Sequence, residues 1–416
     1  MKALDKKRKG NISNGWHRMS VGEICSIANG QVSPLDEEYR NLKHIGPENI
    51  ESGTGRIIEL KTAESLGLMS GKYVFDEYAI VYSKIRPNLN KVCLPNFRGL
   101  CSADAYPLWP TEDIVIREFL FYSLLSPQFV RQSIAVSMRT GMPKINRSDL
   151  NRLLVDIPEI PEQKRIVSLL STWDRAIEQT ERLIAAKRRR KQGLMQQLLT
   201  GKRRFKEFGK LVVKHGDLPK GWKRTQIGNI FKEVTDKVGS RDIPPYSITA
   251  GTGFVSHEEK WGKNIAGSQH SNYTLLRKGQ FSYNKGNSKR YPCGCMYRLE
   301  HVEEIAVPSV FISFESRGEV CDEFYKQYFM ADLCASELRR YITSGARSDG
   351  LLNISKDDFF SVSLPLPQLL EQRRIAAVLN VCDTELERLS VQLVAFKEQK
   401  KGLMQHLLTG KVRVKV

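Results

Sequence analysis

The chain has 416 residues, of which 41% are hydrophobic, so it is long enough to form two or more packed domains. Lysine and arginine exceed aspartate and glutamate by 19 charges, which favours a polyanionic partner. Nucleic acid is the leading candidate, ahead of an anionic membrane surface or an acidic protein. No stretch is apolar enough to cross a membrane, which excludes a protein built from membrane-spanning helices.

Residues 1–156 are predicted to form a first globular part. Its segment 73–95, YVFDEYAIVYSKIRPNLNKVCLP, reads as a strand of alternating apolar residues that runs into a basic, asparagine-rich loop. Arginine and lysine read guanine and asparagine reads adenine in the major groove, and basic side chains also hold phosphates. We therefore predict DNA contacts from the loop residues Lys84, Arg86, Asn88, Asn90 and Lys91, and from a second surface at Arg139, Thr140, Lys144, Asn146 and Arg147.

Residues 157–205 are predicted to contain a long helix of roughly 37 residues, or about 55 Å at 1.5 Å per residue. Its apolar residues recur in alternating steps of four and three, which is the seam of a coiled coil. The apolar seam positions are Ile166, Leu170, Trp173, Ile177, Ile184, Leu194 and Leu198. Lys191 interrupts the seam, Pro158 and Pro161 precede the helix, and Gly201 should end it. The basic run at 187–191 has two interpretations, a phosphate-tracking strip or a solvated helix face.

Residues 206–363 are predicted to form a second globular part that weakly repeats the first. GWKRTQIGNI at 221–230 matches GWHRMSVGEI at 15–24, and ISKDDF at 354–359 matches INRSDL at 145–150. Segment 273–295 again reads as a strand followed by a basic loop. The candidate DNA-contacting residues at the equivalent places are Lys285, Asn287, Ser288, Lys289 and Arg290, and Arg347, Ser348, Asn353 and Lys356.

Residues 364–416 are predicted to contain a second long helix that duplicates the first. Segment 371–411 aligns with 162–202 without a gap, at an offset of 209 residues, and the ends GLMQQLLTGK and GLMQHLLTGK are nearly identical. The seam continues through Ile375, Leu379, Leu386, Leu389, Leu393, Phe396, Leu403 and Leu407, with Lys400 at the position of Lys191. Two matching helices in one chain favour packing against each other over packing of each on its own globular part.

Signals for catalysis and metal binding are missing from the sequence. There is no phosphate-binding loop of the G-x-x-x-x-G-K-[ST] type, and IPPY at 243–246 lacks the polar first residue of an adenine methyltransferase motif. The eight cysteines are scattered, and only Cys293 and Cys295 are close together, without further ligands at zinc spacing. We therefore predict free thiols, no metal site, a cytoplasmic protein and no catalysis by this chain alone.

The two copies of the long helix carry a resemblance to a known family. IPEIPEQKRIVSLLSTWD with GLMQQLLTGKRRF, and LPLPQLLEQRRIAAVLN with GLMQHLLTGKVRV, resemble the specificity subunits of type I restriction-modification systems. The resemblance implies two target-recognition domains that mix helices and strands, of class α/β (α+β). Two long helices, packed as an antiparallel coiled coil, would separate them in a pseudo-twofold internal repeat. The helices would act as a ruler between domains that each read one half of a bipartite, asymmetric DNA site.

The resemblance also implies partners and cofactors. Two modification (methyltransferase) subunits would bring S-adenosylmethionine, and restriction subunits would add translocation and cleavage driven by ATP with Mg²⁺. This chain would bind double-stranded DNA and none of these cofactors itself. Three alternatives stay open at this point: a DNA-binding coiled-coil protein that works alone, a self-sufficient restriction-modification enzyme, and a silent or recombination-donor copy of a specificity subunit.

Overall fold

The computed structural model describes residues 15–137, 143–209, 218–286, 288–343 and 351–415. The chain divides into two compact units, of which unit 1 comprises Met1–Glu181 and Val391–Val416, and unit 2 comprises Arg182–Ser390. Each unit therefore contains one globular part and one segment from each of two long helices. The predicted segments follow one another along the chain, whereas the compact units combine them, because the helices pack into the cores of the globular parts.

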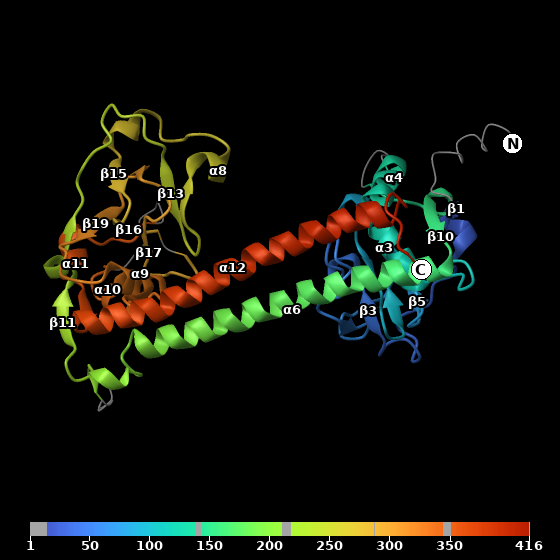
Figure 1. Ribbon diagram of the computed structural model, residues 1–416, viewed down its shortest axis with the longest axis horizontal. Helices are drawn as coiled ribbons and strands as arrows, with labels where there is room; N and C mark the ends of the chain where they lie inside the picture. Colours follow the sequence, from blue (N-terminus) through green and yellow to red (C-terminus); the bar gives the residue numbers. More distant parts are fainter. Residues whose placement is uncertain (1–14, 138–142, 210–217, 287, 344–350, 416) are drawn as a thin grey trace. The chain divides into compact units, whose positions relative to one another are not determined.

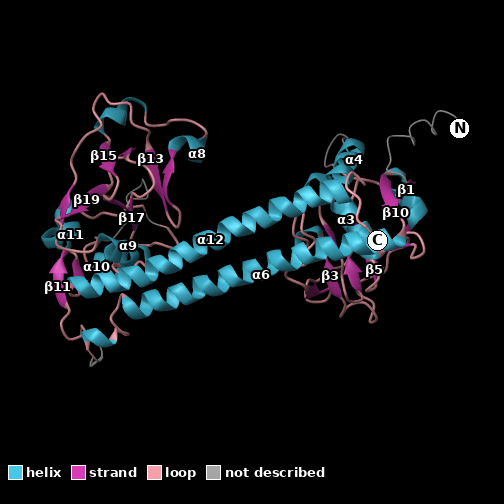
Figure 2. Cartoon of the chain, viewed as in Figure 1, coloured by secondary structure: helices cyan, strands magenta, loops and turns pink. Residues whose placement is uncertain are grey.

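The globular part of unit 1 is a mixed assembly of short strands and helices (Figure 2). Its strands are β1 (Trp16–Ser20), β2 (Cys25–Ile27), β3 (Lys43–Ile45), β4 (Lys61–Thr62), β5 (Tyr73–Phe75), β6 (Ile80–Ser83), β7 (Val92–Cys93), β8 (Gly99–Cys101), β9 (Ala105–Pro110) and β10 (Leu154–Pro158). Its short helices are α2 (Val21–Ile24), η1 (Pro47–Asn49), η2 (Pro87–Leu89), α3 (Arg117–Leu125), α4 (Pro127–Ser137) and α5 (Arg147–Arg152). The strands form sheets in the orders β2-β9-β6-β7, β4-β3-β8-β5 and β1-β10.

The globular part of unit 2 repeats much of this plan. Its strands are β11 (Lys223–Gln226), β12 (Phe231–Glu233), β13 (Tyr246–Thr249), β14 (Gly253–Ser256), β15 (Thr274–Arg277), β16 (Phe281–Asn284), β17 (Cys295–Arg298), β18 (Glu304–Val307), β19 (Ile312–Ser316) and β20 (Ser363–Leu366). Its short helices are η3 (Lys206–Phe208), α7 (Ile227–Ile230), α8 (His257–Trp261), η4 (Gly267–Asn272), α9 (Asp322–Met330), α10 (Ala335–Leu338) and α11 (Lys356–Ser361). The order β12-β19-β16-β17 corresponds to β2-β9-β6-β7, and β11-β20 corresponds to β1-β10.

The strand predicted within 73–95 is two strands, β5 and β6, separated by a turn. The carboxylate of Asp76 ends β5, because its Oδ1 accepts hydrogen bonds from the backbone amides of Tyr78 (3.0 Å) and Ala79 (3.1 Å). The equivalent segment of unit 2 likewise divides into β15 and β16, at Gly279 with φ of 92°. In both segments polar residues interrupt the apolar pattern at the turn, Asp76 and Glu77 in unit 1 and Arg277 to Gln280 in unit 2, so reading each segment as one strand was wrong.

The two long helices are α6 (Ile160–Leu198) and α12 (Leu369–Leu407), each of 39 residues (Figure 1). None of the predicted apolar seam residues is exposed, which follows from their coiled-coil spacing. In unit 1 the ring centroids of Trp173 and Phe396 lie 5.6 Å apart across the seam. Gly201 and Gly410 follow the last turns at φ of 70° and 66°, a left-handed conformation that ends helices and favours glycine.

Within each unit the segments of α6 and α12 run antiparallel. In unit 1 the ion pairs are Glu162–Arg413 and Asp174–Lys400, so the partner's residue number decreases as the number along α6 increases. In unit 2, Lys191–Asp383 and Arg204–Glu371 follow the same rule. The two predicted packing modes are combined, since the helices pair with each other and also enter the globular cores. Ile166 and Leu407 belong to the core of unit 1, and Leu198, Ile375 and Leu379 to that of unit 2.

The basic run at 187–191 divides between the two interpretations offered for it. Lys187 and Lys191 face the partner helix and pair with Glu385 and Asp383, whereas Arg188, Arg189 and Arg190 are exposed. Its lysines therefore stabilise the helix pair.

All eight cysteines carry free thiols. Among the described helices, none combines the length and the apolar character that a membrane crossing requires.

Candidate nucleic-acid interface

The predicted contact surfaces of unit 1 form one continuous surface. The loop after β6 lies beside the segment that precedes α5, because the amide of Arg86 donates to the carbonyl of Pro143 (2.8 Å) and the amide of Ile145 donates to the carbonyl of Lys84 (2.8 Å). Residues about 60 positions apart in the sequence are thereby held side by side. Arg139 and Thr140 lie outside the described residues.

Positive charge gathers around one aromatic ring of this surface. The Nζ of Lys84 lies 4.8 Å from the ring centroid of Tyr106, and the guanidinium of Arg147 lies 5.6 Å from the same centroid. Arg86 and Lys144 are exposed beside them. Burial lowers the pKa of Lys84, and the charge of Lys144 lowers it further. Within the described part of the chain none of these four cations forms a salt bridge, so the cluster repels cations and attracts anions.

Some predicted contact residues of unit 1 instead hold the loop together. Asn90 has φ of 47° and donates from Nδ2 to the carbonyl of Leu125 at the end of α3 (2.9 Å). Lys91 donates from Nζ to the carbonyl of Pro47, and Asn146 caps α5 by accepting from the amide of Asp149 (2.8 Å). Lys84 is only 8% exposed, so its charge acts from beneath the surface. Arg86, Asn88 and Lys144 are exposed and have the freedom to meet a ligand.

The equivalent loop of unit 2 is built in the same way. It follows β16 and lies beside the segment at 351–354, where the amide of Leu352 donates to the carbonyl of Lys285 (2.9 Å). Lys289 and Arg290 are exposed, and the guanidinium of Arg290 lies 5.5 Å from the ring centroid of Tyr291. A basic side chain on an aromatic ring therefore recurs in unit 2, although the ring comes from the loop itself and not from the strand equivalent to β9.

The remaining predicted residues of unit 2 are divided in their contacts. Ser288 accepts from the amide of Tyr291 (3.0 Å), Asn353 donates to Thr343 Oγ1 (2.8 Å), and Lys356 pairs with Glu233. Asn287, Arg347 and Ser348 lie outside the described residues. The loop of unit 2 thus offers a different set of side chains from that of unit 1, on a related backbone.

The aromatic members of the two clusters, Tyr106 and Tyr291, were not predicted from the sequence. Tyr106 lies in β9, within a run that reads simply as an apolar strand, and Tyr291 is 8% exposed at the end of its loop. Only their spatial approach to the basic side chains distinguishes them.

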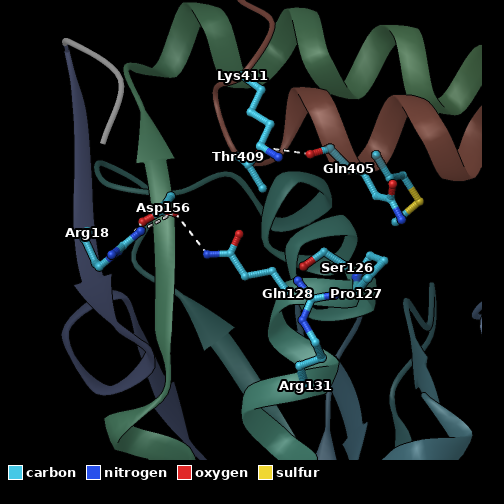
Figure 3. Close-up of a pocket in the computed structure, with 10 residues that line it drawn as sticks. Arg18, Ser126, Pro127, Gln128, Arg131, Asp156, Gln405, Thr409 and Lys411 are labelled. Atoms are coloured by element: carbon cyan, nitrogen blue, oxygen red, sulfur yellow. Dashed lines mark hydrogen bonds and ion pairs between the residues drawn. The ribbon is translucent and has the colours of Figure 1, made fainter. Parts of the chain in front are cut away.

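A polar hollow in unit 1 is lined by residues of β1, β10, α4 and α12 (Figure 3). Arg18 and Asp156 face each other across β1 and β10 and form two hydrogen bonds of 2.6 and 2.9 Å, and Gln128 also donates to Asp156 (3.1 Å). Arg131 and Lys411 are exposed at its edge. Because its central charges neutralise each other, we assign the hollow a structural role in joining the two strands.

Comparisons with known proteins agree with this arrangement. Residues 13–187 match the family model described as the type I restriction modification DNA specificity domain. The predicted resemblance to type I specificity subunits is confirmed. Over 167 residues the chain is 39% identical to the type I restriction enzyme EcoDI specificity subunit of Escherichia coli, a match that covers 40% of this chain and 36% of that protein. The chain thus spans about a third of that relative's length.

A match along almost the whole chain also exists at lower identity. The type I restriction enzyme MjaVIII specificity subunit of Methanocaldococcus jannaschii is 26% identical over 97% of this chain and 94% of its own length. A chain from the solved structure on complex assembly and conformational transition of the type I R-M system superimposes with a TM-score of 0.61. That alignment covers 97% of this chain and 100% of the other at 18% identity. It confirms the predicted fold class of two mixed α and β domains with long helices.

Proposed function

We propose that this chain is the DNA sequence-specificity subunit of a type I restriction-modification complex and reads a bipartite, asymmetric site. The observation that carries the proposal is a duplicated scaffold with two different loop regions: Lys84 and Arg147 lie around the ring of Tyr106 in unit 1, and Arg290 alone lies against the ring of Tyr291 in unit 2. Phosphates and base edges are the partners that such groups suit. Unequal side chains on equivalent backbones suit a site whose two halves differ in sequence.

The same proposal assigns the chemistry to partner subunits. Two modification subunits with S-adenosylmethionine would methylate adenine after base flipping, and restriction subunits with ATP and Mg²⁺ would translocate and cleave DNA. The relatives named above support this assembly by their family. The chain itself recognises the DNA sequence and serves as the scaffold within a type I site-specific deoxyribonuclease and adenine methyltransferase complex.

A map of methylated adenines in the host genome, with and without this gene, tests the proposed function. We expect a two-part motif that disappears on deletion and returns on complementation. An unchanged map with the partner subunits expressed would favour a silent or donor copy. Sequence-specific binding by the purified chain alone, at high affinity and without methylation, would favour a stand-alone DNA-binding coiled-coil protein.

Removing the exposed cations Arg86 and Lys144 from the loop surface of unit 1 should weaken DNA binding without changing the sequence that is read. In the double variant Arg86→Gln/Lys144→Gln, we expect the slope of log Kobs against log[salt] to become shallower by roughly 1.8, because each lost phosphate contact removes about 0.9. The measurement is a salt titration of the complex on its cognate site. The control is Lys164→Gln/Arg165→Gln, which removes two exposed cations from α6 in the same unit. Equal slopes in the two variants would place the loop surface of unit 1 outside the DNA interface.

A further inference from the structure

Two polar junctions, one in each unit, join a long-helix pair to its recognition domain. Lys400 and Lys191 lie on the seam, 209 residues apart, and each is only 8% exposed. A buried ammonium group is stable only with a close partner. In unit 1 the partner of Lys400 is Asp174, and in unit 2 the partner of Lys191 is Asp383, each at 2.5 Å. These aspartates are also 209 residues apart.

Each aspartate has a second donor that comes from the recognition domain. In unit 1 the hydroxyl of Tyr122, on α3, donates to Asp174 Oδ2 (2.7 Å), and Lys400 Nζ lies 5.3 Å from the ring centroid of Tyr122. In unit 2 the amide of Gln327, on α9, donates from Nε2 to Asp383 Oδ2 (2.7 Å). A lysine–aspartate pair alone satisfies the seam, so the second donor has a separate consequence: it fixes the helix of the recognition domain against the long helices.

A short path of contacts continues from each junction to the candidate reading loop. In unit 1, α3 packs against β7 and β9, and the carbonyl of its last residue, Leu125, accepts from Asn90 in the loop (2.9 Å). In unit 2, α9 packs against β17, the strand that follows the loop, and Glu323 on α9 accepts from Arg298 on β17 (2.6 Å). In unit 1 the helix held by the junction therefore bonds to the loop itself, and in unit 2 it packs against the strand that follows the loop.

We propose that Tyr122 and Gln327 are positioning residues, which set the orientation in which each recognition domain presents its loop relative to the helix pair. The inference rests on the proposed function, because orientation matters only if two half-sites must be met at a fixed separation. A domain held at one angle accepts one gap between half-sites. A domain released from its junction samples several angles and accepts neighbouring gaps as well.

The two junctions are chemically different. Tyr122 donates its single hydroxyl proton to Asp174, whereas Gln327 is completely buried and its Oε1 has no hydrogen-bond partner among the described residues. Gln327 Nε2 also reaches Asn380 Oδ1 (3.2 Å). A buried acceptor without a partner is destabilising, so an apolar replacement of similar volume removes that penalty together with the junction. Gln327→Met should therefore fold while it releases the second domain.

The test measures gap selectivity of the complete complex with its modification subunits. DNA duplexes would carry the mapped site with its own gap and with gaps one base pair shorter or longer. We expect the preference of the wild-type complex for its own gap to fall at least threefold in Tyr122→Phe and in Gln327→Met, with the preferred bases of both half-sites unchanged. The control is Tyr82→Phe, which removes a buried tyrosine hydroxyl of the same domain that bonds to Ser133 on α4 (3.1 Å) and not to a long helix.

The outcomes separate this inference from the proposed function. Unchanged gap preference in both variants, or an equal loss in Tyr82→Phe, would overturn the positioning role while the wild-type complex still reads its site. A wild-type complex that binds no two-part site would overturn both. Altered base preference at unchanged gap preference would make these residues part of the reading surface and would also overturn the positioning role.

Discussion

Seven residues inserted into each long helix, after Glu181 and after Ser390, are expected to abolish methylation of the original site. These positions are the limits between the two compact units, so the insertions lengthen the helices without entering either core. A heptad adds about 10.5 Å at 1.5 Å per residue and preserves the seam. That length corresponds to roughly three base pairs at 3.4 Å each, so any recovered motif should have a longer gap. Sequencing of methylated adenines measures both the loss and the new gap.

An insertion in one helix alone should be more harmful than the paired insertion. The unequal helices would have to bulge by two turns or break one set of seam contacts, such as Lys191–Asp383 in unit 2. The control is the same heptad after Gly67, in an exposed turn of unit 1 outside the long helices. An unaltered motif in the paired variant would refute the ruler role of the helices, whereas loss of the motif in the Gly67 variant would make the result one of folding.

The long helices were predictable because their constraint is periodic. Apolar residues that recur at coiled-coil spacing lie on one face of a helix, which must be buried. The duplicated copy shows the same pattern a second time, at equivalent positions. The polar exceptions Lys191 and Lys400 were also visible in the sequence, and their pairing with aspartate follows from the cost of an isolated buried charge. The donors Tyr122 and Gln327 were not visible, because they reach the seam from another part of the chain.

The positions of the candidate DNA-contacting loops were predictable from the sequence, whereas the roles of their individual residues were less so. Composition located the loop after β6 and the segment before α5, and the structure joins them by backbone hydrogen bonds. The same asparagine that suits adenine also suits a helix cap or a left-handed turn, and Asn146 and Asn90 serve those local roles. Sequence does not separate the two uses, since both need one short polar side chain. Whether any loop residue contacts DNA stays a prediction.

Loss of the carboxylate of Glu371 is expected to destabilise unit 2 by about 3–5 kcal/mol, the range for breaking a buried ion pair from one side. Glu371 is fully buried, and it accepts two hydrogen bonds from Arg204 (2.8 and 2.7 Å) and one from Trp222 Nε1 (2.9 Å). The side chain of Arg204 is itself only 4% exposed, so Glu371→Gln leaves its charge buried without compensation. Denaturant unfolding of the full chain, followed by tryptophan fluorescence, measures the loss.

The duplicated chain supplies a matched control in Glu162→Gln. Glu162 occupies the position equivalent to Glu371 and accepts two hydrogen bonds from Arg413, but the side chain of Arg413 is 45% exposed. Water can solvate that guanidinium once the carboxylate is gone, so we expect a loss of about 1 kcal/mol, typical of a pair with one exposed partner. Equal losses in the two variants would contradict this account, because they would mean that stability depends on the carboxylate itself and not on how deeply its arginine is buried.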